Sequence, residues 1–165
     1  MAIQQLIDVL ASLDDLHRNM LEVGEVKKSA LVRNDIEKLI QVMNQESKIL
    51  KQIEQREAER IEACQAILLE KGIKSRLNLT VTELTRLVFD TEEKQKLQQV
   101  QSSLSQTLEQ LKRLNELNQK LIEQSLTFID YSLGLFGGET QEATYQHPSD
   151  KSVGAQRSGL FDTRA

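Results

Sequence analysis

The chain has no tryptophan, one proline and one cysteine among its 165 residues. Aromatic residues make up 4% of the sequence, so its core must consist mostly of leucine, isoleucine and valine. The single cysteine, Cys64, excludes a disulfide bond within the chain, and on an apolar stripe it is expected to be a small, inert, buried residue. These scarcities favour helices packed side by side over a thick globular core.

The sequence also lacks an excess of basic residues and a long apolar segment near its start. Its formal net charge is -4, which provides no positive field for phosphates, so no nucleic acid is expected as a partner. Asp8, Asp14 and Asp15 interrupt the apolar residues of segment 1–21, which excludes a signal peptide or a membrane-inserted helix there. We therefore expect a cytoplasmic protein.

What the sequence does contain is helical periodicity, which extends furthest between Leu97 and Phe136. One apolar stripe with spacings of three and four is typical of an amphipathic helix. It comprises Leu97, Val100, Leu104, Leu108, Leu111, Ile122, Leu126, Ile129, Leu133 and Phe136.

A second stripe, displaced by roughly a third of a turn, is present only in the later half of this segment. One neighbouring helix can cover the early half, whereas the later half carries more apolar surface than one neighbour would cover. The second stripe comprises Leu114, Leu117, Leu121, Phe128 and Leu135.

The first half of the chain predicts two helices joined by a short connection. Gly24 weakens the first helix by roughly 1 kcal/mol relative to alanine, and we interpret it as a tolerated defect or a close packing point. Asn34, with Glu37 three residues later, is typical of a helix N-terminus, and Gly72 of a C-terminal stop. Because the connection is so short, the two helices should form an antiparallel hairpin.

Capping signals recur in the middle of the chain. Thr80 and Glu83 form a capping box before a short apolar segment, and Asp90 or Thr91 can cap the long final helix. The sequence thus predicts an all-α fold: a long antiparallel helical hairpin, a short helix and a long C-terminal helix, at about 3–29, 35–71, 81–89 and 91–136.

The composition changes at the end of the last helix. Gly134, Gly137 and Gly138 terminate it, and the following residues are polar or small, with almost no apolar periodicity. We therefore expect a helical domain at 1–138 and a flexible polar tail at 139–165.

Residues suited to catalysis or metal binding are few. His17 follows Asp14 by three positions, as in half of a carboxylate-bridged metal site, but the only other histidine is His147 in the tail. We therefore expect no metal, no cofactor and no catalytic residue, and no enzyme class is supported.

The surplus apolar surface in the last helix has two interpretations. It can pack against both arms of the hairpin inside a bundle, or it can form a groove or exposed helix that takes an amphipathic helix from another protein. Both can hold in part.

The segment Leu114–Ile122, followed by Ser125, Leu126 and Phe128 and then a glycine-rich stop and a tyrosine-containing tail, resembles the FlgN-like flagellar export chaperones. The resemblance implies a chaperone of the flagellar type III export system. Such proteins bind the C-terminal helical regions of hook-filament junction proteins, prevent premature assembly and deliver them to the cytoplasmic domain of the export gate.

The resemblance also implies site residues. Asn115, Asn118, Leu121 and Ile122 match the family motif, and Tyr145 is the nearest candidate for a tail aromatic that docks at the export gate. Together with the apolar pattern, this leads to the hypothesis that the second stripe receives the client and that the two asparagines set its register. The predicted client-binding residues are Leu114, Asn115, Leu117, Asn118, Leu121, Ile122, Phe128 and Leu135.

The competing class is a coiled-coil adaptor or self-assembling helical protein, whose surplus stripe would be buried in its own homodimer. A third class, an enzyme with a metal site in a helical bundle, would require bound metal, and none is expected.

Overall fold

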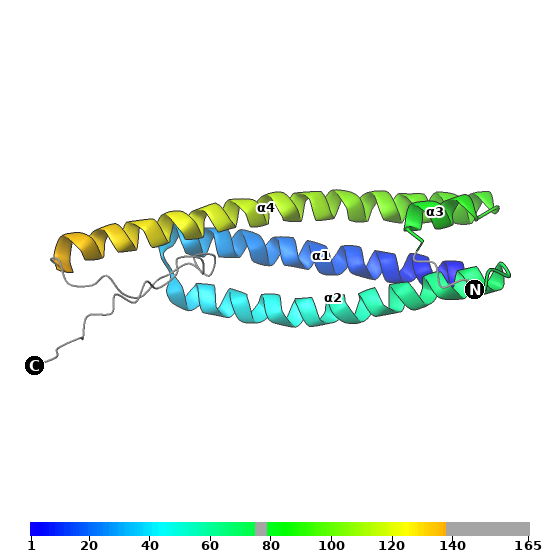
Figure 1. The fold of residues 1–165 in the computed structure, drawn as a ribbon, viewed down its shortest axis with the longest axis horizontal. Helices are drawn as coiled ribbons and strands as arrows, with labels where there is room; N and C mark the ends of the chain where they lie inside the picture. Colours follow the sequence, from blue (N-terminus) through cyan, green and yellow to red (C-terminus); the bar gives the residue numbers. More distant parts are fainter. Residues whose placement is uncertain (75–78, 138–165) are drawn as a thin grey trace, which may run out of the picture. The chain divides into compact units, whose positions relative to one another are not determined.

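The computed structural model describes residues 1–74 and 79–137, and every regular element within them is a helix (Figure 1). The predicted all-α class is therefore confirmed. By its internal contacts the chain divides into two compact units, Met1–Leu126 and Thr127–Ala165. The helices are α1 (Ala2–Arg33), α2 (Ile36–Glu70), α3 (Val81–Arg86) and α4 (Thr91–Gly137).

The connection between α1 and α2 is a two-residue turn, Asn34 and Asp35, which makes the predicted antiparallel hairpin. Asn34 adopts the left-handed conformation, with φ 54°, and ends α1. Asp35 then caps α2, because its carboxylate accepts a hydrogen bond of 3.0 Å from the Lys38 amide. The prediction that Asn34 caps the second helix is therefore wrong by one residue. α1 also continues to Arg33, past its predicted end near residue 29.

The helix ends in the middle of the chain follow their predicted signals. Gly72 has a positive φ of 74°, as expected for a glycine that follows a helix. Thr80 and Glu83 form the predicted capping box, and α3 ends at Arg86 rather than at residue 89. Asp90 caps α4 by accepting a hydrogen bond from the Glu93 amide.

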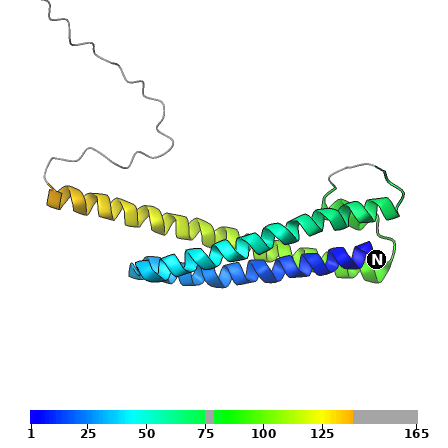
Figure 2. The ribbon, with the colours of Figure 1, turned by 90° about the horizontal axis from the view of Figure 1, so that it is seen from below.

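The main core lies at the end of the first unit where all four helices meet, and α3 lies beside the first turns of α4 (Figures 1 and 2). Buried leucines from all four helices fill it. The turn at the other end of the hairpin is held by a smaller group, Ala30, Leu31 and Val42. The central residues of the main core are Leu6, Leu10, Leu13, Ile67, Leu68, Leu84, Val88 and Leu97.

Candidate functional site

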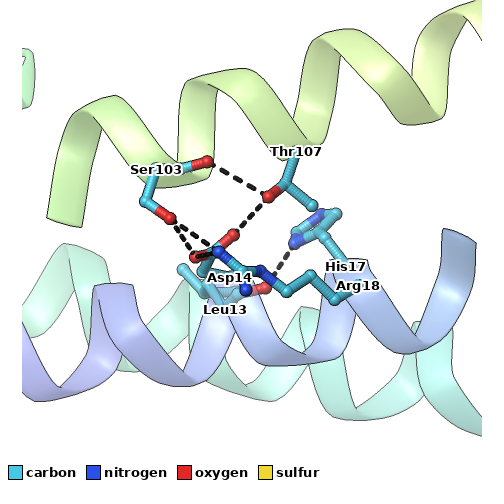
Figure 3. Close-up of polar contacts among 6 residues, drawn as sticks. All are labelled: Leu13, Asp14, His17, Arg18, Ser103 and Thr107. Atoms are coloured by element: carbon cyan, nitrogen blue, oxygen red, sulfur yellow. Dashed lines mark hydrogen bonds and ion pairs between the residues drawn. The ribbon is translucent and has the colours of Figure 1, made fainter.

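A buried polar cluster joins α1 to α4 (Figure 3). The Asp14 carboxylate accepts hydrogen bonds from the hydroxyls of Ser103, at 2.6 Å, and Thr107, at 2.5 Å. Arg18 lies 3.1 Å from the same carboxylate and also donates to Ser103. The sequence pattern does not reveal this cluster, because no local signal pairs Asp14 with residues about ninety positions away.

The surroundings of the Asp14 carboxyl favour its ionised form. Burial alone would raise its pKa, but the hydrogen bonds from Ser103 and Thr107 favour the charged form, and so does the positive charge of Arg18. The pKa of Asp14 therefore lies below its ordinary value. All of the partners belong to this chain, which makes the cluster a structural contact between two helices.

His17 and Asp14 do not act as a pair. The Nδ1 of His17 lies 2.6 Å from the Leu13 carbonyl oxygen, one turn earlier in the same helix. Among the residues that the structure describes, no group of three or more histidine, cysteine, aspartate or glutamate side chains could hold a metal ion. The Cys64 side chain is buried, as predicted, and burial raises the pKa of its thiol.

The close contact between α1 and α4 is made at Gly24. A Cβ atom at this position would lie 2.7 Å from Cδ2 of Leu114, so only glycine admits the leucine there without a shift. One turn further along α4, the Asn118 amide donates a hydrogen bond of 3.0 Å to the Gly24 carbonyl. Gly24 is thus the predicted close packing point.

The sequence predicts Leu114 and Asn118 on the client-binding surface, but this contact buries both. Their side chains are 7% and 2% exposed, respectively, because α1 covers them. Within this chain they position α4 on α1, and neither is available to another protein while that contact lasts.

The remaining predicted client-binding residues are at least partly accessible. In the first unit, Leu117 is 43% exposed, Asn115 is exposed, and Leu121 and Ile122 are half-buried. In the second unit, Phe128 and Leu135 are 69% and 65% exposed. The predicted export-gate residue, Tyr145, lies outside the described residues.

A groove runs between α2 and α4 within the first unit, and we call it the α2/α4 groove. α1 forms its floor, and the start of α3 closes one end. The floor is apolar at Leu10 and Leu13, whereas the walls mix apolar and polar side chains. The residues that line the groove are Leu10, Leu13, His17, Ile53, Glu57, Arg60, Thr80, Val81, Thr82, Gln101, Leu104, Ser105 and Leu108.

Leu108 and Leu117 point to opposite sides of α4. Nine residues separate them, and a helix turns by about 100° per residue, so their directions differ by about 180°. Leu108 lines the α2/α4 groove, and Leu117 therefore lies on the other flank of the helix. The apolar surface of α4 in the first unit is thus accessible from two sides.

The described helices are all too short or too polar to cross a membrane. A surplus of apolar surface along a long helix is suited to binding another helix.

Comparison with known proteins assigns the family. The profile of the family described as FlgN protein matches residues 1–152. The chain belongs to the FlgN protein family. It is also 30% identical over 170 residues to the uncharacterized protein YvyG of Bacillus subtilis (strain 168), and this match covers 100% of both chains. No solved structure matches the chain significantly.

Membership of the FlgN family confirms the resemblance carried by the segment Leu114–Ile122. It supports a role as a flagellar export chaperone. Within this segment the two asparagines have different environments: Asn118 is buried against α1, and Asn115 is exposed.

Proposed function

We propose that this flagellar export chaperone binds the C-terminal helical regions of hook-filament junction proteins in the cytoplasm. It prevents their premature assembly and delivers them to the flagellar type III export gate. The chaperone acts by binding and release, without a catalytic step of its own.

The observation that carries this proposal is the exposed apolar surface of the later part of α4. In the first unit it includes Leu117, which is 43% exposed, and the half-buried Leu121 one turn later. The described part of the second unit, 127–137, is a helical segment with large, exposed apolar side chains. These are Phe128, Ile129, Tyr131, Leu133, Leu135 and Phe136, each at least 50% exposed.

Such a surface favours an amphipathic helix as the ligand. Apolar residues at spacings of three and four present a continuous strip along a helix, and a second helix can lay its own apolar stripe on it. A junction subunit whose terminal helix is left uncovered would aggregate or polymerise. Covering that helix therefore keeps the subunit soluble and prevents its early assembly. Asn115 follows Leu108 by one heptad, so its exposed amide lies on the flank of α4 opposite Leu117, where it can set the register of a client helix by hydrogen bonding.

Co-purification with C-terminal helical segments of the junction subunits, followed by size exclusion with light scattering, tests this proposal. The wild type should form a complex of defined mass. The double substitution Leu117→Asp and Leu121→Asp should weaken it by at least about a hundredfold, since burying each leucine is worth about 1.5–3 kcal/mol.

A matched control is Leu69→Asp on α2, where the leucine is 66% exposed and lies outside α4. It should leave client affinity unchanged. Thermal melting must show that each variant remains folded. If the double variant is folded and binds as tightly as the wild type, α4 is not the client surface. A tight homodimer without any client complex, disrupted by the same two changes, would support the self-assembling class instead.

A further inference from the structure

We propose that the α2/α4 groove holds a second amphipathic helix of the client, placed end to end with α3. This inference rests on the proposed function and extends it, because it adds a second client contact on the flank of α4 opposite Leu117. The client would then contact α4 from both sides.

The first support is what already occupies the adjoining stretch of this surface. α3 is itself a short amphipathic helix, and its Leu84 and the following Val88 are 0% and 2% exposed in the core. Thr82 of α3 also accepts a hydrogen bond of 2.8 Å from the Gln101 amide of α4. The open groove begins where α3 starts, so it continues an interface that a helix already fills.

The second support is the character of the groove walls beyond α3. On α2, Leu50 and Met43 lie one and two heptads before Glu57, which lines the groove, so they continue the same wall. They are 51% and 53% exposed. On α4, Leu108 follows Gln101 by one heptad and is 42% exposed. Beyond α3, each wall therefore presents exposed apolar side chains.

The third support is the length of the apolar stretch. Lys27 of α1 lies two heptads after the floor residue Leu13, and its ammonium group pairs with the Glu46 carboxylate of α2 at 3.2 Å. Both side chains of this ion pair are about one-fifth exposed, and Lys27 follows by three residues the position at which Leu114 of α4 covers Gly24. The floor therefore runs from Leu10 to Gly24, about 21 Å, which suits a helix of about four turns.

These features define the occupant. It is one amphipathic helix of about four turns, with apolar residues at spacings of three and four toward α1. A polar residue near one end would meet the ion pair of Lys27 and Glu46. A second copy of this chain is a poorer occupant, because α1, α2 and α3 already direct their buried faces at their own neighbours, and the exposed apolar segment 127–137 of α4 spans only about three turns. A client helix brings a free apolar stripe.

Leu108 and Leu117 form a matched pair for the test, because both are leucines of α4, with 42% and 43% exposure, on opposite flanks. Leu108→Lys and Leu117→Lys would each be titrated with the C-terminal helical segment of a junction subunit. Isothermal titration calorimetry would give the affinity, and thermal melting would confirm folding. We expect each change to weaken binding by at least about tenfold.

If Leu117→Lys weakens binding while Leu108→Lys binds like the wild type, the groove proposal is overturned and the proposed function stands. If the wild type binds no junction segment, both are overturned. Light scattering adds a third outcome: a homodimer that Leu108→Lys disrupts without any loss of client affinity would assign the groove to a second copy and overturn the proposal.

A second pair of variants keeps the test decisive if Leu108→Lys does not fold. Ser105 is an exposed groove residue, so Ser105→Trp would fill the groove without opening the core. Ser102→Trp places the same bulk on an exposed serine of α4 that does not line the groove and precedes Leu117 by fifteen residues. The first should weaken client binding by at least about tenfold and the second should not; equal affinities for both would overturn the proposal.

Discussion

At the scale of single residues, Gly24 and Leu114 show how a small residue sets the distance between two helices. In a helix interior, glycine costs roughly 1 kcal/mol relative to alanine. Here it admits the Leu114 side chain, which is 7% exposed, and leaves the Gly24 carbonyl accessible to the Asn118 amide. The propensity cost is thus offset by packing that no larger residue permits.

Gly24→Ala should lower the free energy of unfolding by about 1 kcal/mol. The added methyl gains about 1 kcal/mol of helix propensity but overpacks Leu114, and overpacking typically costs about 1–3 kcal/mol. Urea unfolding followed by circular dichroism measures the difference. Gly134→Ala is the control, because a Cβ there meets nothing within 4 Å, and it should increase helicity. If Gly24→Ala stabilised the protein, α4 would have to shift readily at this contact.

At the scale of elements, the helices are held together by two kinds of contact. Apolar packing at the main core joins all four, whereas α1 and α4 are also joined by the polar cluster of Asp14, Ser103 and Thr107. Buried hydrogen bonds of this kind have a fixed geometry, so they favour one register between two helices. The register places Leu108 over the groove and Leu117 on the opposite flank.

Asp14→Asn should lower the free energy of unfolding at pH 7 by about 1–3 kcal/mol, the usual cost of impairing a buried hydrogen-bonded charge. Because the pKa of Asp14 is lowered on folding, its contribution is fully present above the unfolded pKa, near 3.8, and is lost as the pH falls through the folded pKa. The difference between variant and wild type should therefore shrink in strong acid.

Urea unfolding at pH 7 and in acid would check this dependence. Asp15→Asn is the matched control, since Asp15 is the exposed neighbour of Asp14 and should show little effect at either pH. A loss of stability that is the same at every pH would contradict an ionised, hydrogen-bonded Asp14.

At the scale of the whole molecule, the first unit is a packed helical bundle, and the described part of the second unit is a helical segment with exposed apolar side chains. This division suits a chaperone, because the packed part can remain folded while an exposed part binds clients. The predicted domain at 1–138 and tail at 139–165 remain predictions, since residues 138–165 lie outside the described part.

Removing residues 139–165 should impair client delivery more than it impairs folding. The tail sequence has almost no apolar periodicity, so it can contribute little to a core, and the thermal melting temperature should change little. Secretion of junction proteins should fall in cells that carry the truncated chain. Tyr145→Ala in the full-length chain tests the predicted docking aromatic separately. A truncated chain that is folded and supports normal secretion would exclude a role for the tail.

Local sequence signals predicted most of the secondary structure. The capping box at Thr80 and Glu83, the stop at Gly72 and the apolar periodicity act within a few residues, so the sequence alone locates them. The misplaced cap at Asn34 shows the limit of such signals. Asn34 and Asp35 can both cap a helix, and only the path of the turn decides that the first ends α1 and the second begins α2.

The sequence by itself also determined that the later part of the last helix carries more apolar surface than one neighbour can cover. Only the tertiary structure decided which of those residues are buried. Leu114 and Asn118 are covered because α1 presents Gly24 opposite them, while Leu117, in the same predicted stripe, is exposed. Periodicity defines the faces of a helix, but the partner of each face depends on contacts between residues far apart in the chain.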